Sequence, residues 1–157
     1  MPISAPAAAS GRGLTRLVTA SLVVVGALAL AAPAFAASTS EWSKSADKIC
    51  ARTNAEIDKI PEPDSTKTLI SGTEKILELG KRQTSDLAKL KRPSGDASTI
   101  AKLVGVYERQ VGVVKSLIDA LKHDDRAKVK TLLAQGNDLQ SKAKSLARKL
   151  GALRCAQ

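Results

Sequence analysis

The stretch SLARKLGALRCAQ, residues 145–157, ends an apolar stripe at Leu150, follows it with a glycine and carries a cysteine at position 155. The only other cysteine is Cys50, in the segment KICARTNAEI at residues 48–57. The pattern around Cys50 is typical of a helix. A bond between the two cysteines would bring the last residues of the chain back to a helix near its beginning.

The first 36 residues have the three parts of a secretory signal peptide. Arg12 and Arg16 precede an uncharged apolar run at 17–30, and Ala34 and Ala36 occupy the −3 and −1 positions of an A-x-A cleavage site. An uncleaved membrane anchor is the alternative, because the run approaches the length of a membrane span. We expect cleavage after Ala36, an extracytoplasmic location in the cell envelope or outside it, and no transmembrane segment in the remaining chain.

Export predicts the state of the two cysteines. In an oxidising compartment an even pair is most simply a disulfide. A redox-active or metal-binding pair would need close spacing or a neighbouring histidine, and the only histidine is His123. We therefore expect a Cys50–Cys155 disulfide that closes almost the whole exported chain into one loop.

Four segments carry apolar residues at the alternating three- and four-residue spacing of one helix face, and strand patterns are absent. The sequence predicts helices at about 40–60, 65–91, 97–122 and 126–150. Short connections separate them, the first two with prolines, and they offer Asp64 or Ser65, Asp96 or Ser98, and Asp124 or Asp125 as N-caps. Such elements form an all-α, up-down-up-down antiparallel four-helix bundle, which we expect to fill one domain at 37–157.

In this topology the first helix begins at the pole where the fourth helix ends. Cys50 lies roughly 15 Å into its helix from that pole, and residues 151–155 span roughly 16 Å when extended. We expect Gly151 to turn the chain and the tail ALRC (152–155) to fold back along the first helix to Cys50. Asn54 is the expected hydrogen-bonding partner of this tail.

The two ends of the exported chain resemble a loose group of small secreted helical proteins, mostly actinobacterial. The motifs that carry the resemblance are I-C-x-x-x-N-A-x-I and L-A-x-x-L-G-x-x-x-C, with the residues Ile49, Cys50, Asn54, Ala55, Ile57, Leu146, Ala147, Leu150, Gly151 and Cys155. The resemblance implies a disulfide-tied helical bundle in a bacterium. It brings no activity with it.

Motifs for catalysis and cofactor binding are absent from the sequence. His123 is predicted at the end of the third helix, and no acidic residue falls on the apolar stripes, so the paired Glu and His ligands of bundle metal sites are lacking. A C-x-x-C-H haem attachment and a phosphate-binding glycine loop are also missing. We expect no metal, no cofactor and no enzymatic activity.

Small and polar residues interrupt the apolar stripes. Glycines at stripe positions cost about 1 kcal/mol each relative to alanine, and close approach of two helices is the simpler explanation for them. The alternative is an internal cavity, whose candidate lining residues are Thr53, Thr73, Gly80, Gln83 and Gly136. Such a cavity would make the protein a carrier of a small ligand.

The chain is strongly basic, with a formal net charge of +10. The predicted pole shared by the second and fourth helix ends gathers seven candidate anion-binding residues: Lys89, Lys91, Arg92, Lys144, Arg148, Lys149 and Arg154. Cations at helix ends partly complement the helix dipole. The functional interpretation is a secreted, non-enzymatic module that binds anionic envelope polymer, lipid headgroups or a protein partner through this pole. We expect no nucleic acid partner, because no aromatic residues interleave the basic ones, and the oligomeric state stays open.

Overall fold

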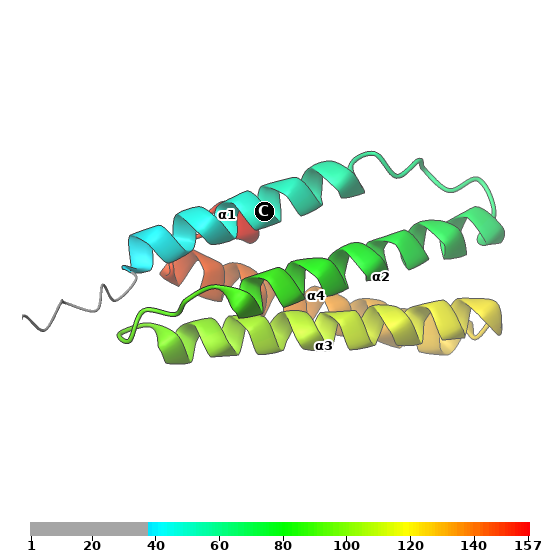
Figure 1. Ribbon diagram of the computed structural model, residues 1–157. Helices are drawn as coiled ribbons and strands as arrows, with labels where there is room; N and C mark the ends of the chain where they lie inside the picture. Colours follow the sequence, from blue (N-terminus) through cyan, green and yellow to red (C-terminus); the bar gives the residue numbers. More distant parts are fainter. Residues whose placement is uncertain (1–37) are drawn as a thin grey trace, which may run out of the picture. The chain divides into compact units, whose positions relative to one another are not determined.

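The computed structural model describes residues 38–157, and the signal peptide and cleavage site predicted in residues 1–36 lie outside that range. The described chain forms four helices, α1 (Thr39–Ile57), α2 (Thr66–Lys89), α3 (Ala97–Lys122) and α4 (Arg126–Lys149), and a 3-10 turn η1 (Arg154–Ala156). Successive helices run in opposite directions (Figure 1). The all-α, up-down-up-down four-helix bundle is therefore confirmed, and no strand occurs among these residues.

Side chains cap three of the four helices. Ser38 forms a capping box with Glu41 at the start of α1, Ser65 caps α2, and the Asp125 carboxylate accepts from the amide of Lys128 in α4. Each cap satisfies amides that have no partner inside the helix. Of the N-cap residues that the sequence offers, Ser65 therefore caps α2 and Asp125 caps α4.

The start of α3 differs from the expectation. Asp96 occupies the N-cap position but makes no capping hydrogen bond. Its carboxylate instead accepts from the hydroxyl of Thr39, which ties the beginning of α3 to the beginning of α1. A partner from another helix has displaced the local cap.

The predicted end of the first helix at residue 60 is also corrected. α1 ends at Ile57, and the next three residues form a turn in which the amide of Ile60 donates to the carbonyl of Ile57 (2.9 Å). Pro61 explains the shortening, because the residue before a proline is disfavoured in the helical conformation. As a result α1 has 19 residues and α3 has 26, or about 28 Å and 39 Å of helix.

The helices contact one another in chain order. Close backbone contacts join α1 to α2, α2 to α3 and α3 to α4, and η1 contacts both α1 and α4. Among the described residues, no Cα of α1 comes within 8 Å of a Cα of α4. The C-terminal tail therefore fills the place where a fourth helix–helix contact would close the bundle.

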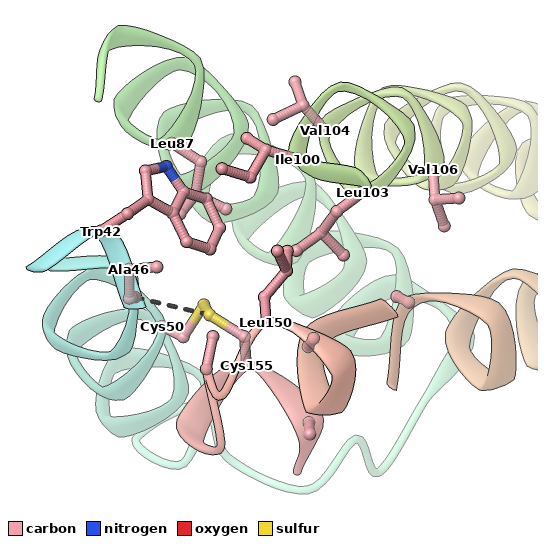
Figure 2. Packing of buried hydrophobic residues seen from close by; sticks show 14 of the residues in the cluster. Trp42, Ala46, Cys50, Leu87, Ile100, Leu103, Val104, Val106, Leu150 and Cys155 are labelled. Atoms are coloured by element: carbon pink, nitrogen blue, oxygen red, sulfur yellow. Dashed lines mark hydrogen bonds between the residues drawn. A yellow bond between two sulfur atoms is a disulfide. The ribbon is translucent and has the colours of Figure 1, made fainter. Parts of the chain in front are cut away.

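The fully buried residues gather at the end of the bundle where α1 begins and α4 ends. We call this region the packed end; its largest buried side chains are Trp42, Leu87, Ile100, Leu103 and Leu150. Figure 2 shows these side chains meeting beside the Cys50–Cys155 bond. The Nε1 atom of Trp42 is buried without an acceptor in the described part of the chain. Such an unsatisfied donor costs about 1–3 kcal/mol, so the packing around the indole must outweigh it.

Candidate functional site

The disulfide holds the tail against α1. Cys50 and Cys155 are bonded, with their Cα atoms 5.1 Å apart. Gly151 turns the chain with φ +72°, a left-handed conformation that suits glycine. The predicted disulfide and the predicted return of the tail are both confirmed.

Hydrogen bonds from two helices also fix the tail. On α1, the Asp47 carboxylate accepts from the amide of Arg154 (2.7 Å), and the side-chain amide of Asn54 donates to the Arg154 carbonyl (3.3 Å). On α3, the Tyr107 hydroxyl donates to the carbonyl of Cys155 (3.2 Å). The expected role of Asn54 is therefore confirmed. Burial also raises the pKa of Tyr107 to about 12, so this hydroxyl stays protonated at neutral pH.

A pocket of about 370 Å³ lies between the four helices beyond the disulfide, and we call it the interior pocket. Its lining includes Cys50 and Cys155 themselves, together with residues from every helix. The aliphatic part of the lining includes Ile76, Leu77, Val111, Val114, Leu117 and Leu132. All of these except Leu132 are only half-buried, although they line a pocket between the helices.

The mouth of the interior pocket lies on the side of α4 and the tail. The most exposed lining residues are Leu133, Asn137 and Gln140 on α4, and Arg154 and Gln157 in the tail. This is the side where α1 and α4 do not touch each other. The pocket therefore exists because α1 is short and the tail covers only the part of the gap next to Cys50.

Some polar side chains of the pocket make hydrogen bonds within the protein, and others do not. The Thr84 hydroxyl donates to the Gly80 carbonyl one turn back (2.8 Å). The side-chain amides of Gln83, Gln110 and Gln140 line the pocket, and none of them makes a hydrogen bond to another group within residues 38–157. These three amides can donate to or accept from a bound molecule.

Four of the five candidate cavity residues line the pocket, namely Thr53, Gly80, Gln83 and Gly136. The fifth, Thr73, does not line it. Thr73 is buried, and its hydroxyl donates to the carbonyl of Leu69 one turn earlier (2.7 Å). A helical threonine satisfies its own hydroxyl in this way, so its polarity was not a sign of a cavity.

The simpler explanation of the stripe glycines, close helix approach, is wrong. A Cβ atom at Gly80 would lie 3.6 Å from the Val111 side chain, and one at Gly136 would lie 3.9 Å from Val113. Both are ordinary contacts, so alanine would fit at either position. The glycines instead leave space in the interior pocket.

The seven candidate anion-binding residues do not form one group. Lys144 is half-buried and lines the interior pocket together with Arg154. The other five are exposed near the ends of α2 and α4, and Lys89 lies 4.0 Å from the Asp86 carboxylate. Sequence reasoning placed Lys144 and Arg154 at the basic pole and missed that they reach the pocket.

Sequence reasoning also missed Gln110, Asn137 and Gln140 as lining residues. A signal was present, since Gln110 adjoins Val111 and Gln140 adjoins Leu139, both on apolar stripes. Polar residues next to a stripe are normally solvated. Here Asn137 and Gln140 lie at the pocket mouth because no helix covers that side, and the half-buried Gln110 lines the pocket from α3.

Neither a metal-binding cluster nor a membrane-spanning helix is found within residues 38–157. No cluster of three or more His, Cys, Asp or Glu side chains suited to a metal ion occurs there. His123 is exposed at the end of α3, with its Nδ1 atom 2.8 Å from the Asp119 carbonyl oxygen. No helix in this range is both long and apolar enough to cross a membrane.

Comparison with known proteins gave no match to any protein-family model, curated protein or solved structure. The functional argument therefore depends on the geometry of the interior pocket and on the charges around it.

Proposed function

We propose that this protein is a non-enzymatic, exported binding protein that holds a small, mostly apolar molecule in its interior pocket. The observation that carries the proposal is the pocket itself, about 370 Å³ in volume and lined by all four helices. Ligand sites are typically clefts of roughly 300–1,000 Å³ with an apolar lining and a few polar groups. The aliphatic residues and the three glutamine amides fit that description.

Export is the second part of the proposal. The Cys50–Cys155 bond is of a kind that persists in oxidising compartments, and the first 36 residues have the pattern of a signal peptide. Native mass spectrometry of the protein from the extracytoplasmic fraction tests both parts. A chain starting at residue 37 with an added, releasable mass supports the proposal, whereas a full-length chain would contradict cleavage after Ala36, and absence of the protein from this fraction would contradict export.

A pair of glycine variants tests the pocket. Gly136→Leu places a side chain in the pocket, while Gly112→Leu adds the same side chain at an exposed position of α3 with nothing within 4 Å. The probe is Nile red, a neutral apolar dye. We expect the parent and Gly112→Leu to bind one dye molecule and Gly136→Leu to lose it. Equal binding by both variants, or no binding by the parent, would contradict the proposal.

A second candidate function is docking to anionic envelope polymer or lipid headgroups. It is supported by Arg92, Arg148 and Lys149, which are exposed and make no ion pair within the described residues. Arg148 and Lys149 lie in the last turn of α4, where they also complement the helix dipole. Docking through these cations would weaken strongly with salt because exposed charges are screened.

Vesicles test this second function without involving the pocket. The triple variant Arg92→Glu, Arg148→Glu and Lys149→Glu changes only exposed positions. We expect the parent to sediment with anionic but not with neutral vesicles at low salt, and the triple variant to stay in solution. Binding that is insensitive to salt, or equal binding by the triple variant, would contradict docking through these residues.

A further inference from the structure

The charged side chains of the interior pocket are all of one sign. Among the side chains that line it, only Lys144 and Arg154 are basic, and no Asp or Glu side chain is present. Neither cation makes an ion pair with another residue of the described chain. An apolar pocket with two cationic side chains and no acidic side chain suits a ligand that carries a negative charge.

The dipole of α4 explains its last cations but not Lys144. Arg148 and Lys149 lie in the last turn, whereas Lys144 lies five residues before the end of the helix. Dipole effects fall off within the last turn. Lys144 is also half-buried beside the pocket, so its position needs another reason than the dipole or solubility.

Arg154 is held in place by the backbone of the tail. Its amide and carbonyl groups are bonded to Asp47 and Asn54, and the neighbouring Cys155 is bonded to Cys50. The Asp47 carboxylate thus binds the Arg154 amide, and no ion pair joins it to the Arg154 side chain. The backbone that carries the Arg154 guanidinium is therefore fixed at the mouth of the pocket.

Both cations lie at the same end of the pocket. Lys144 lies toward the end of α4, near the tail, and Leu132 lies on the same helix 12 residues earlier, which is about 18 Å along the helix axis. The aliphatic residues of α2 and α3 line the pocket as well. The pocket thus has one cationic end and a long apolar remainder.

Resting on the proposed function, we propose that the ligand is a single-chain alkyl carboxylate whose head binds Lys144 and Arg154 and whose chain lies along Val111, Val114 and Leu117. A guanidinium binds a carboxylate through two parallel hydrogen bonds, and a lysine ammonium adds a third charged donor. A pocket of about 370 Å³ accommodates one chain more readily than two. The amides of Gln110 and Gln140 can bind the head or water beside it.

The first test is a chain-length series of alkyl carboxylates, from eight to sixteen carbons, used below their micelle concentrations to displace Nile red from the oxidised exported domain. We expect the affinity to rise about four-fold per methylene until the pocket is full, as burial of a methylene implies. The same series of alcohols and amines provides the neutral and cationic comparisons. Carboxylates should bind at least ten-fold more tightly than alcohols of equal length, and amines should bind least.

Substitutions of single residues test which side chains bind the carboxylate head of the ligand. Lys144→Gln and Arg154→Gln should each weaken carboxylate binding about ten-fold and leave alcohol binding unchanged. Arg148→Gln is the matched control, because it removes an exposed cation of α4 that does not line the pocket. An equal loss in Arg148→Gln would show a general effect of net charge and would overturn the assignment.

The outcomes separate this inference from the proposed function. Alcohols that bind as tightly as carboxylates would overturn the anionic ligand while the apolar pocket stood. A protein that binds neither series nor the dye would overturn both. A concentration-dependent dimer that excludes the dye, detected by light scattering, would show that a second copy covers the pocket and would also overturn both.

Discussion

The packed end and the interior pocket are built from the same helices but differ in how completely their apolar residues are covered. Val104 and Val111 lie seven residues apart on the apolar stripe of α3, yet Val104 is 4% exposed in the packed end whereas Val111 is only half-buried beside the pocket. The apolar stripes themselves continue through both regions. The difference comes from the gap between α1 and α4. The disulfide-bound tail closes this gap near Cys50, and nothing within residues 38–157 closes it further along. In this bundle, therefore, stripe continuity does not ensure a closed core.

The largest expected effect on stability comes from releasing the C-terminal tail from α1. The double variant Cys50→Ser and Cys155→Ser opens a loop whose ends are 105 residues apart. Chain entropy alone assigns about 4.7 kcal/mol to a loop of roughly 100 residues. We expect a loss of about 3–5 kcal/mol in the free energy of unfolding, measured with urea, and the same loss for the reduced parent. A loss below about 1 kcal/mol would mean that the packed end stands without the tail.

A pair of leucine variants compares the two regions directly. Leu103→Ala should cost about 3–5 kcal/mol, because it removes a fully buried side chain and leaves a cavity. Leu133→Ala should cost less than about 1 kcal/mol, because that side chain is already half exposed. Urea unfolding of both variants gives the difference. Equal losses would show that the pocket side is covered in solution.

Tyr107 lies between the two regions, since it lines the pocket and binds the tail. It is the only tyrosine, so absorbance of the phenolate follows it alone. We expect a titration midpoint near pH 12 in the folded protein, as burial raises the pKa, and near pH 10 in urea. The sign follows from linkage: the neutral phenol stabilises the fold below pH 10, and on the order of 2 kcal/mol is lost as the pH rises from 10 to 12.

Tyr107→Phe serves as the control for that measurement. It should remove the loss of stability between pH 10 and 12 that the phenol contributes. A parent midpoint near pH 10 in the folded state would mean that the tail does not shield this hydroxyl from water.

The smallest effect concerns the glycines. Gly136→Ala should raise the free energy of unfolding by about 0.5–1 kcal/mol, since alanine is the better helix former and its Cβ fits beside Val113. Gly112→Ala, at an exposed position, should give the same gain. A destabilised Gly136→Ala would indicate that the helices are closer there than described, and the pocket smaller.

The local features of the fold could be predicted from the sequence. Prolines and capping residues set the helix ends to within three residues, and Gly151 marked the turn into the tail. The disulfide was predicted from two cysteines and an expected export signal, and the reach of five residues placed the tail against α1. Each of these depends on neighbouring residues or on a distance along the chain.

The covering of each helix face could not be predicted in the same way. α3 contacts both α2 and α4, so Leu103, Val106 and Ala120 are also buried. They lie outside the stripe that the sequence predicts for this helix, which consists of Ile100, Val104, Tyr107, Val111, Val114, Ile118 and Leu121. Leu69 lies on its stripe yet is 39% exposed, because α1 ends before it could cover that part of α2. Burial depends on which helices meet, and a stripe reports only that a face is apolar. The sequence therefore predicted most of the cavity residues that lie on the helix stripes. It did not predict that Lys144 and Arg154 line the interior pocket, because that depends on how the tail and α4 meet.

The pairing of two cysteines at opposite ends of the domain has a consequence for biogenesis. In the export that we propose, Cys50 crosses the membrane before Cys155, so the bond can form only after the residues of all four helices have crossed. With two cysteines in the chain, just one intramolecular pairing exists. Maturation of the exported chain therefore needs an oxidant but no isomerase, because neither thiol has a second partner within the chain.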